Sequence, residues 1–245
     1  MSTRTALVTG ATAGIGRAVA LRLAADGLHV VAHGRDPERG AKLTKEITAS
    51  GGTARFLTAD LANADEVTAL ARAAGEVDVL VNNAGIYALT STPDTTVESF
   101  DRHFAVNTRA PFLLVGALAP AMAERGHGAI VNITASSATS PAPVGAAYGA
   151  SKAAMELLTR SWAAEFGARG VRVNGVSPGP VRTAGTSALF GEAIEAVGQA
   201  NLRSRIGEPE EIAGIVRFLV DDDSSYVNGT VVLANGGVRS AMPAA

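Results

Sequence analysis

A tyrosine and a lysine stand four residues apart in the stretch AAYGASKAAM, which begins at Ala146 and is otherwise composed mainly of small residues. Side chains at positions i and i+4 of a helix are neighbours, so a helix would place Tyr148 and Lys152 on one face. The small flanking residues would leave both polar groups accessible. A cation held near a phenol makes it a better proton donor and acceptor, and the pair therefore predicts a site of proton transfer.

The electrostatic effect of this lysine can be estimated from elementary values. A free tyrosine has a pKa near 10, and lowering it towards 7 requires about 4 kcal/mol of preferential stabilisation of the phenolate. An ammonium about 4 Å away contributes roughly that amount at an effective dielectric constant of about 20. Lys152 is therefore expected to be sufficient to lower the pKa of Tyr148. The alternative is a surface pair with no role, which would be the better explanation if no cofactor site accompanied it.

A glycine-rich turn near the N-terminus supplies a candidate cofactor site. The stretch ALVTGATAGIGRAVA places Gly10, Gly14 and Gly16 between an apolar run and a helical segment. Such a turn lets the backbone approach a pyrophosphate, and the helix N-terminus presents unpaired N–H groups and a partial positive charge. The spacing is G-x-x-x-G-x-G, and a purely structural turn is the alternative. Its place between a strand and a helix favours phosphate binding.

The end of the second apolar run, VVAHGRD, bears on the choice of dinucleotide. Such sites hold a free ribose 2′-hydroxyl with an acidic residue about 20 positions further on, and a 2′-phosphate with a cation. Gly34 occupies the acidic position and Arg35 follows it. A bond from arginine to phosphate contributes about 1.5–3 kcal/mol, so NADP(H) is predicted over NAD(H), with Arg17 as a second candidate cation. Asp36 is the alternative ribose partner, although Asp36 before Pro37 is better explained as a helix cap.

The elements that must position these residues alternate between short β-branched runs and alanine-rich helical patterns. Strands are expected at residues 6–8, 30–32, 55–57, 79–81, 130–133, 171–176 and 231–233. Helices are expected at residues 15–25, 37–49, 64–73, 96–124, 150–169 and 210–220. This alternation implies right-handed crossovers and a parallel sheet covered by helices on both faces. The prediction is a single doubly wound α/β domain over residues 1–245.

Composition argues against several kinds of partner and site. A net charge of −2 argues against an extended nucleic-acid surface. The absence of cysteine excludes thiol chemistry, and the four histidines show no metal-ligand spacing, so no metal site is expected. The longest apolar run, APFLLVGALAPAMA, has 14 residues, and a membrane span needs about 20. The first residues show no signal-peptide pattern, so a cytoplasmic protein without a membrane partner is predicted.

Six motifs in order along the chain resemble those of the short-chain dehydrogenase/reductase family. They are TGATAGIG from Thr9, ADL from Ala59, NNAG from Asn82, VNT from Val106, YGASK from Tyr148 and SPGPVRT from Ser177. The resemblance covers nearly the full length and implies a Rossmann-like, seven-stranded sheet that binds a nicotinamide cofactor. It also implies an NADP(H)-dependent oxidoreductase that interconverts a ketone and a secondary alcohol, as 3-oxoacyl-carrier-protein reductases and ketoreductases do.

The same resemblance implies which residues contact the cofactor. At the glycine turn they are Gly10, Thr12, Ala13, Gly14, Ile15 and Gly16, and Arg35 follows the second strand. The adenine and ribose path is lined by Asp60, Leu61, Asn83, Ala84 and Gly85. The nicotinamide end is lined by Pro178, Gly179, Val181 and Thr183, together with Tyr148 and Lys152.

The resemblance further implies catalytic roles. Tyr148 would be the general acid that protonates the developing alkoxide, and the base in the reverse direction. Lys152 would also hold the nicotinamide ribose, and Asn107 matches the family member that relays protons through water to the lysine. Asn107 could equally be a polar residue that distorts its helix.

The hydroxyl that polarises the substrate carbonyl departs from the family pattern. A serine usually stands 13 residues before the tyrosine, and this chain has Ala135 there. Alignment from the strand side makes Ser136 the equivalent residue, with Ser137 as the alternative.

The substrate region and the assembly are predicted more coarsely. A substrate flap is expected near residues 183–200, with residues 87–92 and 141–144 as the other walls. These suggest an apolar or mixed carbonyl or alcohol substrate, either free or carried on a protein. The helices at 96–124 and 150–169 are apolar on more than one face, which predicts a homodimer or homotetramer. The rival to an enzyme is a non-catalytic NADP-sensing protein on the same fold, which would not need the acid–base pair.

Overall fold

Seven parallel strands form one sheet in the order β3-β2-β1-β4-β5-β6-β7 in the computed structural model, which describes residues 3–88, 90–140, 145–199 and 201–237. The strands are β1 (Thr5–Val8), β2 (His29–Gly34), β3 (Thr53–Thr58), β4 (Val79–Asn82), β5 (Gly128–Ile133), β6 (Val171–Pro178) and β7 (Val231–Ala234). Each of the seven predicted strands is present, and the predicted doubly wound, Rossmann-like α/β fold is confirmed.

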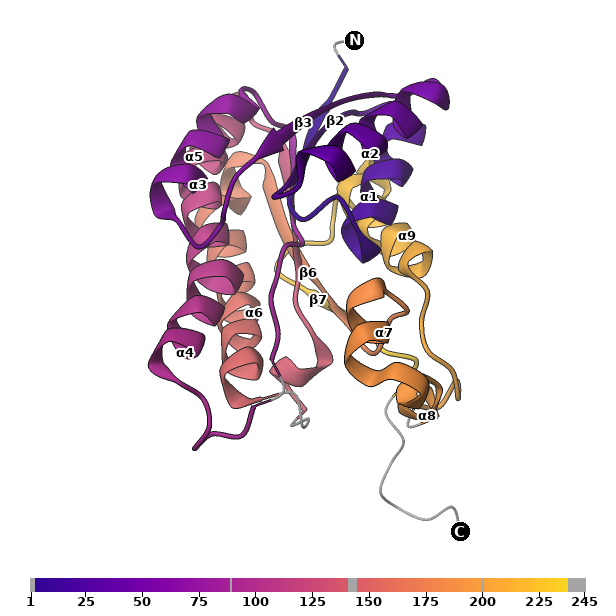
Figure 1. The fold of residues 1–245 in the computed structure, drawn as a ribbon. Coiled ribbons are helices and arrows are strands. Elements are labelled where there is room, and N and C mark those ends of the chain that lie inside the picture. The colour runs from indigo at the N-terminus through magenta and orange to yellow at the C-terminus, as the bar shows by residue number, and fades with distance from the viewer. Residues whose placement is uncertain (1–2, 89, 141–144, 200, 238–245) are drawn as a thin grey trace.

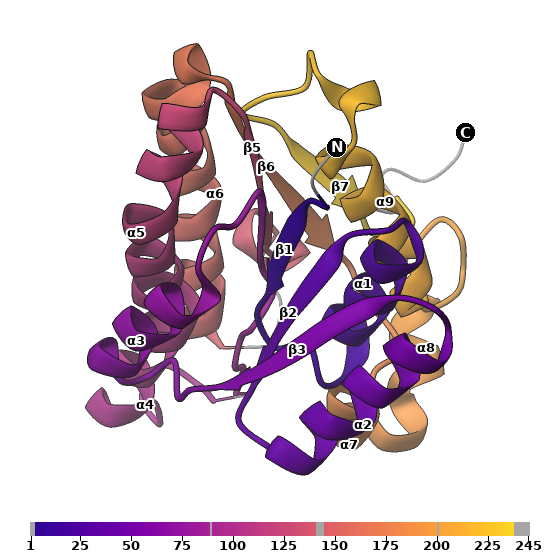
Figure 2. The same ribbon diagram turned by 90° about the horizontal axis from the view of Figure 1, so that it is seen from above.

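Helices cover both faces of the sheet, as Figure 1 and Figure 2 show. One face carries α1 (Gly14–Ala25), α2 (Pro37–Ala49) and α9 (Pro209–Val220), and the other carries α3 (Ala64–Ala74), α5 (Ala110–Arg125) and α6 (Ala146–Phe166). Leu7 and Val8 are adjacent in β1 and pack into opposite apolar layers, as the two-residue period of a strand requires. The sheet is therefore buried on both sides, which explains why its strands read as continuous apolar runs.

The order of the strands creates a crevice at the carboxyl edge of the sheet. From β1 the chain proceeds outward through β2 to β3, then returns to place β4 on the other side of β1. Val8, the last residue of β1, is in register with both Ala32 of β2 and Val81 of β4, so these strands end within two residues of one another. The loops that follow β1 and β4 diverge there, and such a switch point is where open α/β sheets bind ligands.

The prediction of one regular helix at 96–124 is wrong in one respect, because the helix is interrupted. It consists of α4 (Val97–Phe104), a π-helical turn (Ala105–Arg109) and α5. The turn centres on Asn107, whose side chain bonds to the neighbouring backbone of Ile86 and to Ser151 of α6. The extra residue in the turn fits the helix around these contacts, as π-bulges do at functional sites.

The helical stretch Val97–Arg125 is the one segment, within the residues described, that is long and apolar enough to cross a membrane. The 14-residue apolar run considered from the sequence lies inside it. Half of its most apolar window is buried, and Leu114, Leu118 and Met122 lie in the apolar layer shared with α3 and β5. Core helices of folded domains meet the same criteria of length and composition.

Two helix starts depend on particular residues. Asp36 caps α2, accepting hydrogen bonds from the backbone N–H groups of Glu38 at 3.0 Å and Arg39 at 3.2 Å, as predicted. By contrast, α6 begins at Ala146, four residues before the predicted start, directly after Gly145 with φ +87°. A left-handed conformation of this kind favours glycine, and it turns the chain into the helix early enough for the first turn to include Tyr148.

Candidate active site

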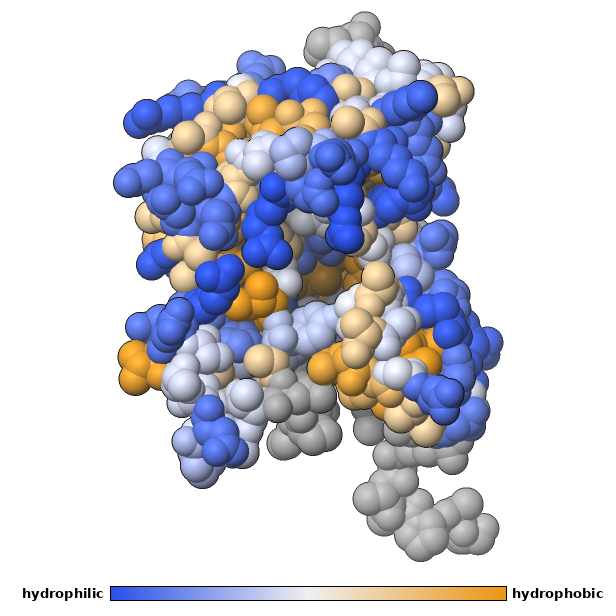
Figure 3. All heavy atoms as spheres, viewed as in Figure 1, coloured by the Kyte–Doolittle hydropathy of each residue, from blue (hydrophilic) through white to orange (hydrophobic). Residues whose placement is uncertain are grey.

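A cavity of about 430 Å³ opens at the carboxyl edge of the sheet, lined by the segments that follow the first six strands. Figure 3 shows the surface hollowed here, between the helices on the left and α7 (Ala184–Phe190) on the right, with hydrophobic atoms inside. Of the residues predicted to contact a cofactor, all but Gly16 line this cavity. The structure thus brings together residues from Gly10 to Thr183 that the sequence scatters.

The glycine turn has the geometry of a phosphate cradle. Gly10 and Gly14 have φ values of +64° and +51°, and a Cβ on Gly14 would lie 2.9 Å from the Thr183 side chain. The residue before α1, Ala13, provides no side-chain cap, so the first N–H groups of the helix remain available at the cavity wall. These features fit a pyrophosphate, for which unpaired helix N–H groups are natural partners.

Gly16 serves a different purpose from the one predicted. A Cβ at this position would lie 2.3 Å from both the Gly10 carbonyl oxygen and the Asn83 Nδ2. Gly16 is therefore required for close packing of α1 against the turn, and it does not line the cavity.

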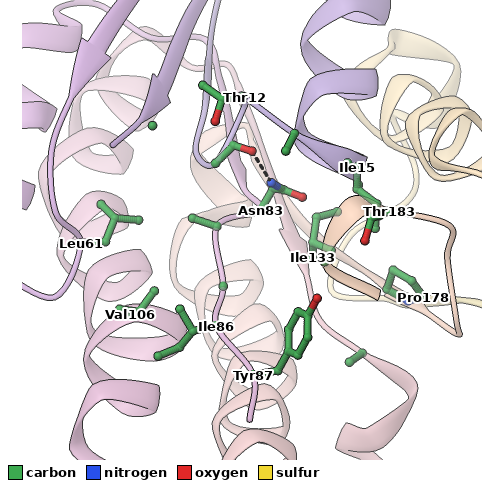
Figure 4. Close-up of a pocket in the computed structure, with 18 of the residues that line it drawn as sticks. Thr12, Ile15, Leu61, Asn83, Ile86, Tyr87, Val106, Ile133, Pro178 and Thr183 are labelled. Carbon is green, nitrogen blue, oxygen red and sulfur yellow. Dashed lines mark hydrogen bonds between the residues drawn. The ribbon is translucent and has the colours of Figure 1, made fainter. Parts of the chain in front are cut away.

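Asn83 locks the turn from the neighbouring strand. Its Nδ2 donates to the carbonyls of Thr9 at 2.9 Å and Gly10 at 3.2 Å, and Figure 4 shows the side chain directed at the turn. The backbone N–H groups of Asn83 and Ala84 both donate to the Thr9 hydroxyl. The side chain of Asn83 is thus committed to the protein, and its contribution to the cavity is to hold β1 and β4 in place.

His33 is a site residue that the sequence reasoning missed. It is buried at the end of β2, accepts from the Gly10 N–H on Nδ1 at 3.3 Å, and donates from Nε2 to the Ala59 carbonyl at 3.1 Å. This pairing requires the neutral ring, and burial lowers the pKa of His33 accordingly. The available signal was a histidine inside the otherwise apolar run VVAHG.

Two arginines line the cavity. Arg35 is exposed, lines the cavity and forms no ion pair within the described part of the chain. The proposal of Arg17 as a second cation is wrong, because its guanidinium is bound to Glu46 of α2 at 2.6 Å. Arg102 of α4, which the sequence reasoning missed, also lines the cavity. Asp60 lies nearby and accepts a hydrogen bond from the Ala62 N–H at 3.0 Å.

Tyr148 and Lys152 face the cavity from the first two turns of α6. The Lys152 Nζ donates to the Ile133 carbonyl at 2.8 Å and lies 6.0 Å from the centre of the Tyr148 ring. Burial, with a further contribution from Tyr87, raises the pKa of Tyr148 to about 12, and burial lowers the pKa of Lys152 to about 8. The expectation that Lys152 lowers the pKa of this phenol is wrong for the protein without cofactor, because desolvation outweighs the more distant ammonium.

Asn107 lies behind the cavity wall and is not part of its lining. Its side chain, 1% exposed, accepts from the Ile86 N–H at 2.8 Å and donates to the Ile86 carbonyl at 2.9 Å and the Ser151 hydroxyl at 3.0 Å. This clamp fixes the backbone of Ile86, which does line the cavity. Asn107 therefore both occupies the helix distortion considered from the sequence and positions the segment after β4.

The serine predicted to polarise a carbonyl does not reach the cavity. The lining includes Ala135, whereas Ser136 and Ser137 are not among the described residues that form it. The chain is extended at Ala135, with φ −165°, and then turns at Ser136 into a short 3-10 helix (Ser136–Ala138). The Ser137 hydroxyl is buried with no hydrogen-bond partner among the residues described.

Tyr87 and α7 form the part of the wall nearest to Tyr148. Tyr87 lines the cavity, and its ring lies edge-on to that of Tyr148 with the centroids 6.0 Å apart. Figure 4 shows its hydroxyl pointing into the cavity, towards Ile133. Next to the Tyr87 hydroxyl, α7 contributes Gly185 to the lining, in the region predicted as a flap. The other predicted wall, residues 141–144, lies outside the described residues.

Comparison with known proteins places this geometry in a well-populated group. A family model described as enoyl-(acyl carrier protein) reductase matches residues 10–239. An uncharacterised oxidoreductase of Methylorubrum extorquens is 40% identical, with 96% of this chain and 98% of that protein covered. A 3-oxoacyl-[acyl-carrier-protein] reductase of a Synechocystis species is 38% identical, with 97% and 98% covered.

Solved structures agree with the sequence relatives. A structure titled as a short chain dehydrogenase/reductase family protein is 48% identical and has a TM-score of 0.90, with 96% of each chain covered. A 3-oxoacyl (acyl-carrier-protein) reductase of Agrobacterium tumefaciens, solved with NADP bound, is 35% identical and has a TM-score of 0.91, with 96% and 93% covered.

Proposed function

Since the chain belongs to the short-chain dehydrogenase/reductase family, we propose that it is an NADP(H)-dependent oxidoreductase that interconverts a ketone and a secondary alcohol. One observation carries this proposal. The acid–base pair Tyr148 and Lys152 opens onto the same cavity as the uncapped first turn of α1 and the free guanidinium of Arg35. A dinucleotide that carries an extra phosphate and a small carbonyl compound could share that cavity.

The residues present fit a nicotinamide dinucleotide phosphate. The turn around Gly10 and Gly14 would hold the pyrophosphate, and Arg35 would bind the 2′-phosphate. The neighbouring enzyme from Agrobacterium tumefaciens was solved with NADP bound, which supports this choice. When bound, the cofactor supplies the hydride that reduces the carbonyl carbon.

The chain itself supplies the proton. Tyr148 stays protonated at neutral pH, because its pKa is raised to about 12, and it would donate its phenolic proton to the carbonyl oxygen as the alkoxide develops. Lys152 would stabilise the resulting phenolate, since a cation favours the charged form of a neighbouring acid. Asn107 holds the segment that faces them through its two bonds to Ile86.

The relatives and the lining support a proposal for the substrate class. The similarity to the 3-oxoacyl-[acyl-carrier-protein] reductase from Synechocystis supports a 3-oxoacyl or polyketide-type ketone as the substrate of this protein, either free or carried on a protein. Tyr87, Ile86 and the α7 residue Ala184 give the cavity a largely apolar wall near Tyr148, which suits such a chain.

The experiment that tests this function follows NADPH oxidation in the presence of a panel of ketones that includes 3-oxoacyl thioesters. We expect turnover with at least one ketone and a loss of roughly a hundredfold or more in Tyr148→Phe. NADPH should still bind the variant, as measured by the fluorescence of the bound nucleotide. NADPH binding without turnover by the wild type on any ketone would instead support a sensor that binds the nucleotide without chemistry.

We further propose that the protein is a cytoplasmic homodimer or homotetramer, assembled through α4, α5 and α6. Phe112 and Leu157 are 53% and 65% exposed on these helices, and Phe112 lies beside Trp162 with their ring centroids 6.1 Å apart. Exposed apolar side chains on neighbouring helices favour burial against a second copy. Sedimentation of a monomer at micromolar concentration would contradict the assembly.

A further inference from the structure

The cavity lacks the hydroxyl that was expected beside Tyr148. Ala135 occupies the wall where a serine was anticipated, and neither Ser136 nor Ser137 belongs to the lining within the described chain. A single phenol would then have to donate its proton and also polarise the carbonyl. A second donor near the carbonyl oxygen would stabilise the negative charge that develops there.

Most other hydroxyls that line the cavity are already committed within the protein. Thr134 donates towards the Val176 carbonyl at 3.2 Å and Glu156 at 3.3 Å. Thr183 and Thr186 lie 3.0 Å apart in the capping box of α7, where Thr186 also donates to the Val181 carbonyl at 2.6 Å.

Thr12 is too far along the cavity to serve, because it belongs to the glycine turn at the phosphate end. A Cβ on Gly34 would lie 2.8 Å from its methyl carbon, which places it beside the end of β2. The remaining hydroxyl that lines the cavity, among the residues described, is that of Tyr87.

Tyr87 lies beside Tyr148 on the cavity wall. The two rings meet edge-on at 6.0 Å and an interplanar angle of 67°, and the Tyr87 hydroxyl points into the cavity in Figure 4. No hydrogen bond to another described residue occupies that hydroxyl. The backbone of its neighbour Ile86 donates one hydrogen bond to the Asn107 side chain and accepts another from it, so the ring projects from a fixed point.

We propose, on the basis of the function proposed above, that Tyr87 is a second catalytic residue, whose hydroxyl donates a hydrogen bond to the substrate carbonyl oxygen that Tyr148 protonates. Tyr87 keeps its own proton throughout, so the reaction still consumes one proton from Tyr148 and one hydride from the cofactor. Burial raises the pKa of Tyr87, which keeps its hydroxyl protonated and available as a donor. In this chain a phenol thus replaces the serine.

The first test compares the turnover of Tyr87→Phe, Ser136→Ala and Ser137→Ala on one ketone substrate. Loss of one preorganised donor costs roughly a hundredfold in kcat, so Tyr87→Phe should fall by about that factor with unchanged affinity for NADPH. The two serine variants should stay within about twofold of the wild type. Unchanged kcat in Tyr87→Phe, or a comparable loss in Ser136→Ala alone, would overturn the proposal.

A rescue experiment separates loss of a donor from loss of fold. Ala135 lies on the same cavity wall, so Ala135→Ser in the Tyr87→Phe background would restore a hydroxyl to it. We expect the kcat of this double variant to be at least about tenfold higher than that of Tyr87→Phe alone. No recovery, with an unchanged thermal midpoint and NADPH affinity, would count against a hydrogen-bonding role for Tyr87.

A neighbouring glycine offers an independent test. A Cβ on Gly185 would lie 2.2 Å from the Tyr87 hydroxyl, so Gly185→Ala should push that hydroxyl aside. Gly185→Ala should therefore lower kcat in the wild type and change it little in the Tyr87→Phe background. Equal losses in both backgrounds would show that α7, and not the phenol, is affected.

These outcomes distinguish the two proposals. A wild type that turns over no ketone would refute the proposed function and, with it, the role of Tyr87. An active wild type whose kcat does not depend on Tyr87 would refute the role of Tyr87 alone.

Discussion

Lys152 holds its ammonium 6.0 Å from the centre of the Tyr148 ring and donates its 2.8 Å hydrogen bond to the Ile133 carbonyl. Lys152 is buried and Tyr148 is partly buried, and burial disfavours the charged form of each, so the pKa of Tyr148 rises while that of Lys152 falls. In this arrangement the phenol is an acid that retains its proton. The free protein thus holds the proton that Tyr148 would deliver in the proposed ketone reduction.

Titration of the tyrosines checks this protonation state directly. With a pKa raised to about 12, Tyr148 should contribute no phenolate in the free protein between pH 6 and 10. Ultraviolet difference spectra of the wild type and Tyr148→Phe should then be superimposable over that range. A phenolate signal near neutral pH that disappears in Tyr148→Phe would show that Lys152 already acidifies the phenol without cofactor.

Lys152→Met should stabilise the protein without cofactor while removing its activity. The pKa of Lys152 is lowered from 10.5 to about 8, so the penalty for burying its charge is absent above pH 10.5 and complete below about pH 8. At pH 7 this penalty corresponds to roughly 3 kcal/mol, less the value of the lost bond to Ile133. Urea unfolding at pH 7 should show the gain, and it should shrink as the pH approaches 10.5. A less stable variant at pH 7 would contradict the assignment.

Arg35→Ala should change the preference between nucleotides. A guanidinium–phosphate bond contributes about 1.5–3 kcal/mol, so the affinity for NADPH should fall roughly tenfold to a hundredfold while the affinity for NADH stays nearly constant. Arg39 of α2 is the matched control, because it is an exposed arginine four residues further along the chain and is already paired with Asp36 at 3.4 Å. Fluorescence titration of both nucleotides measures the effect. Equal losses for NADPH and NADH would exclude a 2′-phosphate contact.

Gly16→Ala and Gly116→Ala should have opposite effects on stability, although both glycines lie in helices. The Cβ of alanine at 16 would meet the Gly10 carbonyl at 2.3 Å, whereas nothing lies within 4 Å at 116. Overpacking should cost about 1–3 kcal/mol at 16, and the better helix propensity of alanine should add up to about 1 kcal/mol at 116. Thermal unfolding measures the stability of both variants. Unchanged stability in Gly16→Ala would show that the glycine turn can shift to make room for the added methyl group.

The sequence by itself determined the sheet, most of the helices and nearly all of the cofactor cavity. Strands buried on both faces read as short apolar runs, and the glycine turn, the Asp36 cap and the ordered motifs are local signals that need no knowledge of distant contacts. Because the carboxyl ends of parallel strands meet at one edge, the motifs that follow them had to converge there.

The tertiary structure alone decided which side chains are free to act. The sequence offers both Arg17 and Arg35 as candidate cations. In the structure Glu46 of α2 binds Arg17, whereas Arg35 lines the cavity. The motif alignment assigns Ser136 a place beside Tyr148, but the chain turns after Ala135 and Ser136 does not line the cavity. Tyr87 lines it instead. The pKa of Tyr148 likewise depends on burial by residues far away in the chain. Desolvation and hydrogen-bond pairing depend on residues that are distant in the chain and close only in the folded protein, so the local sequence does not predict them.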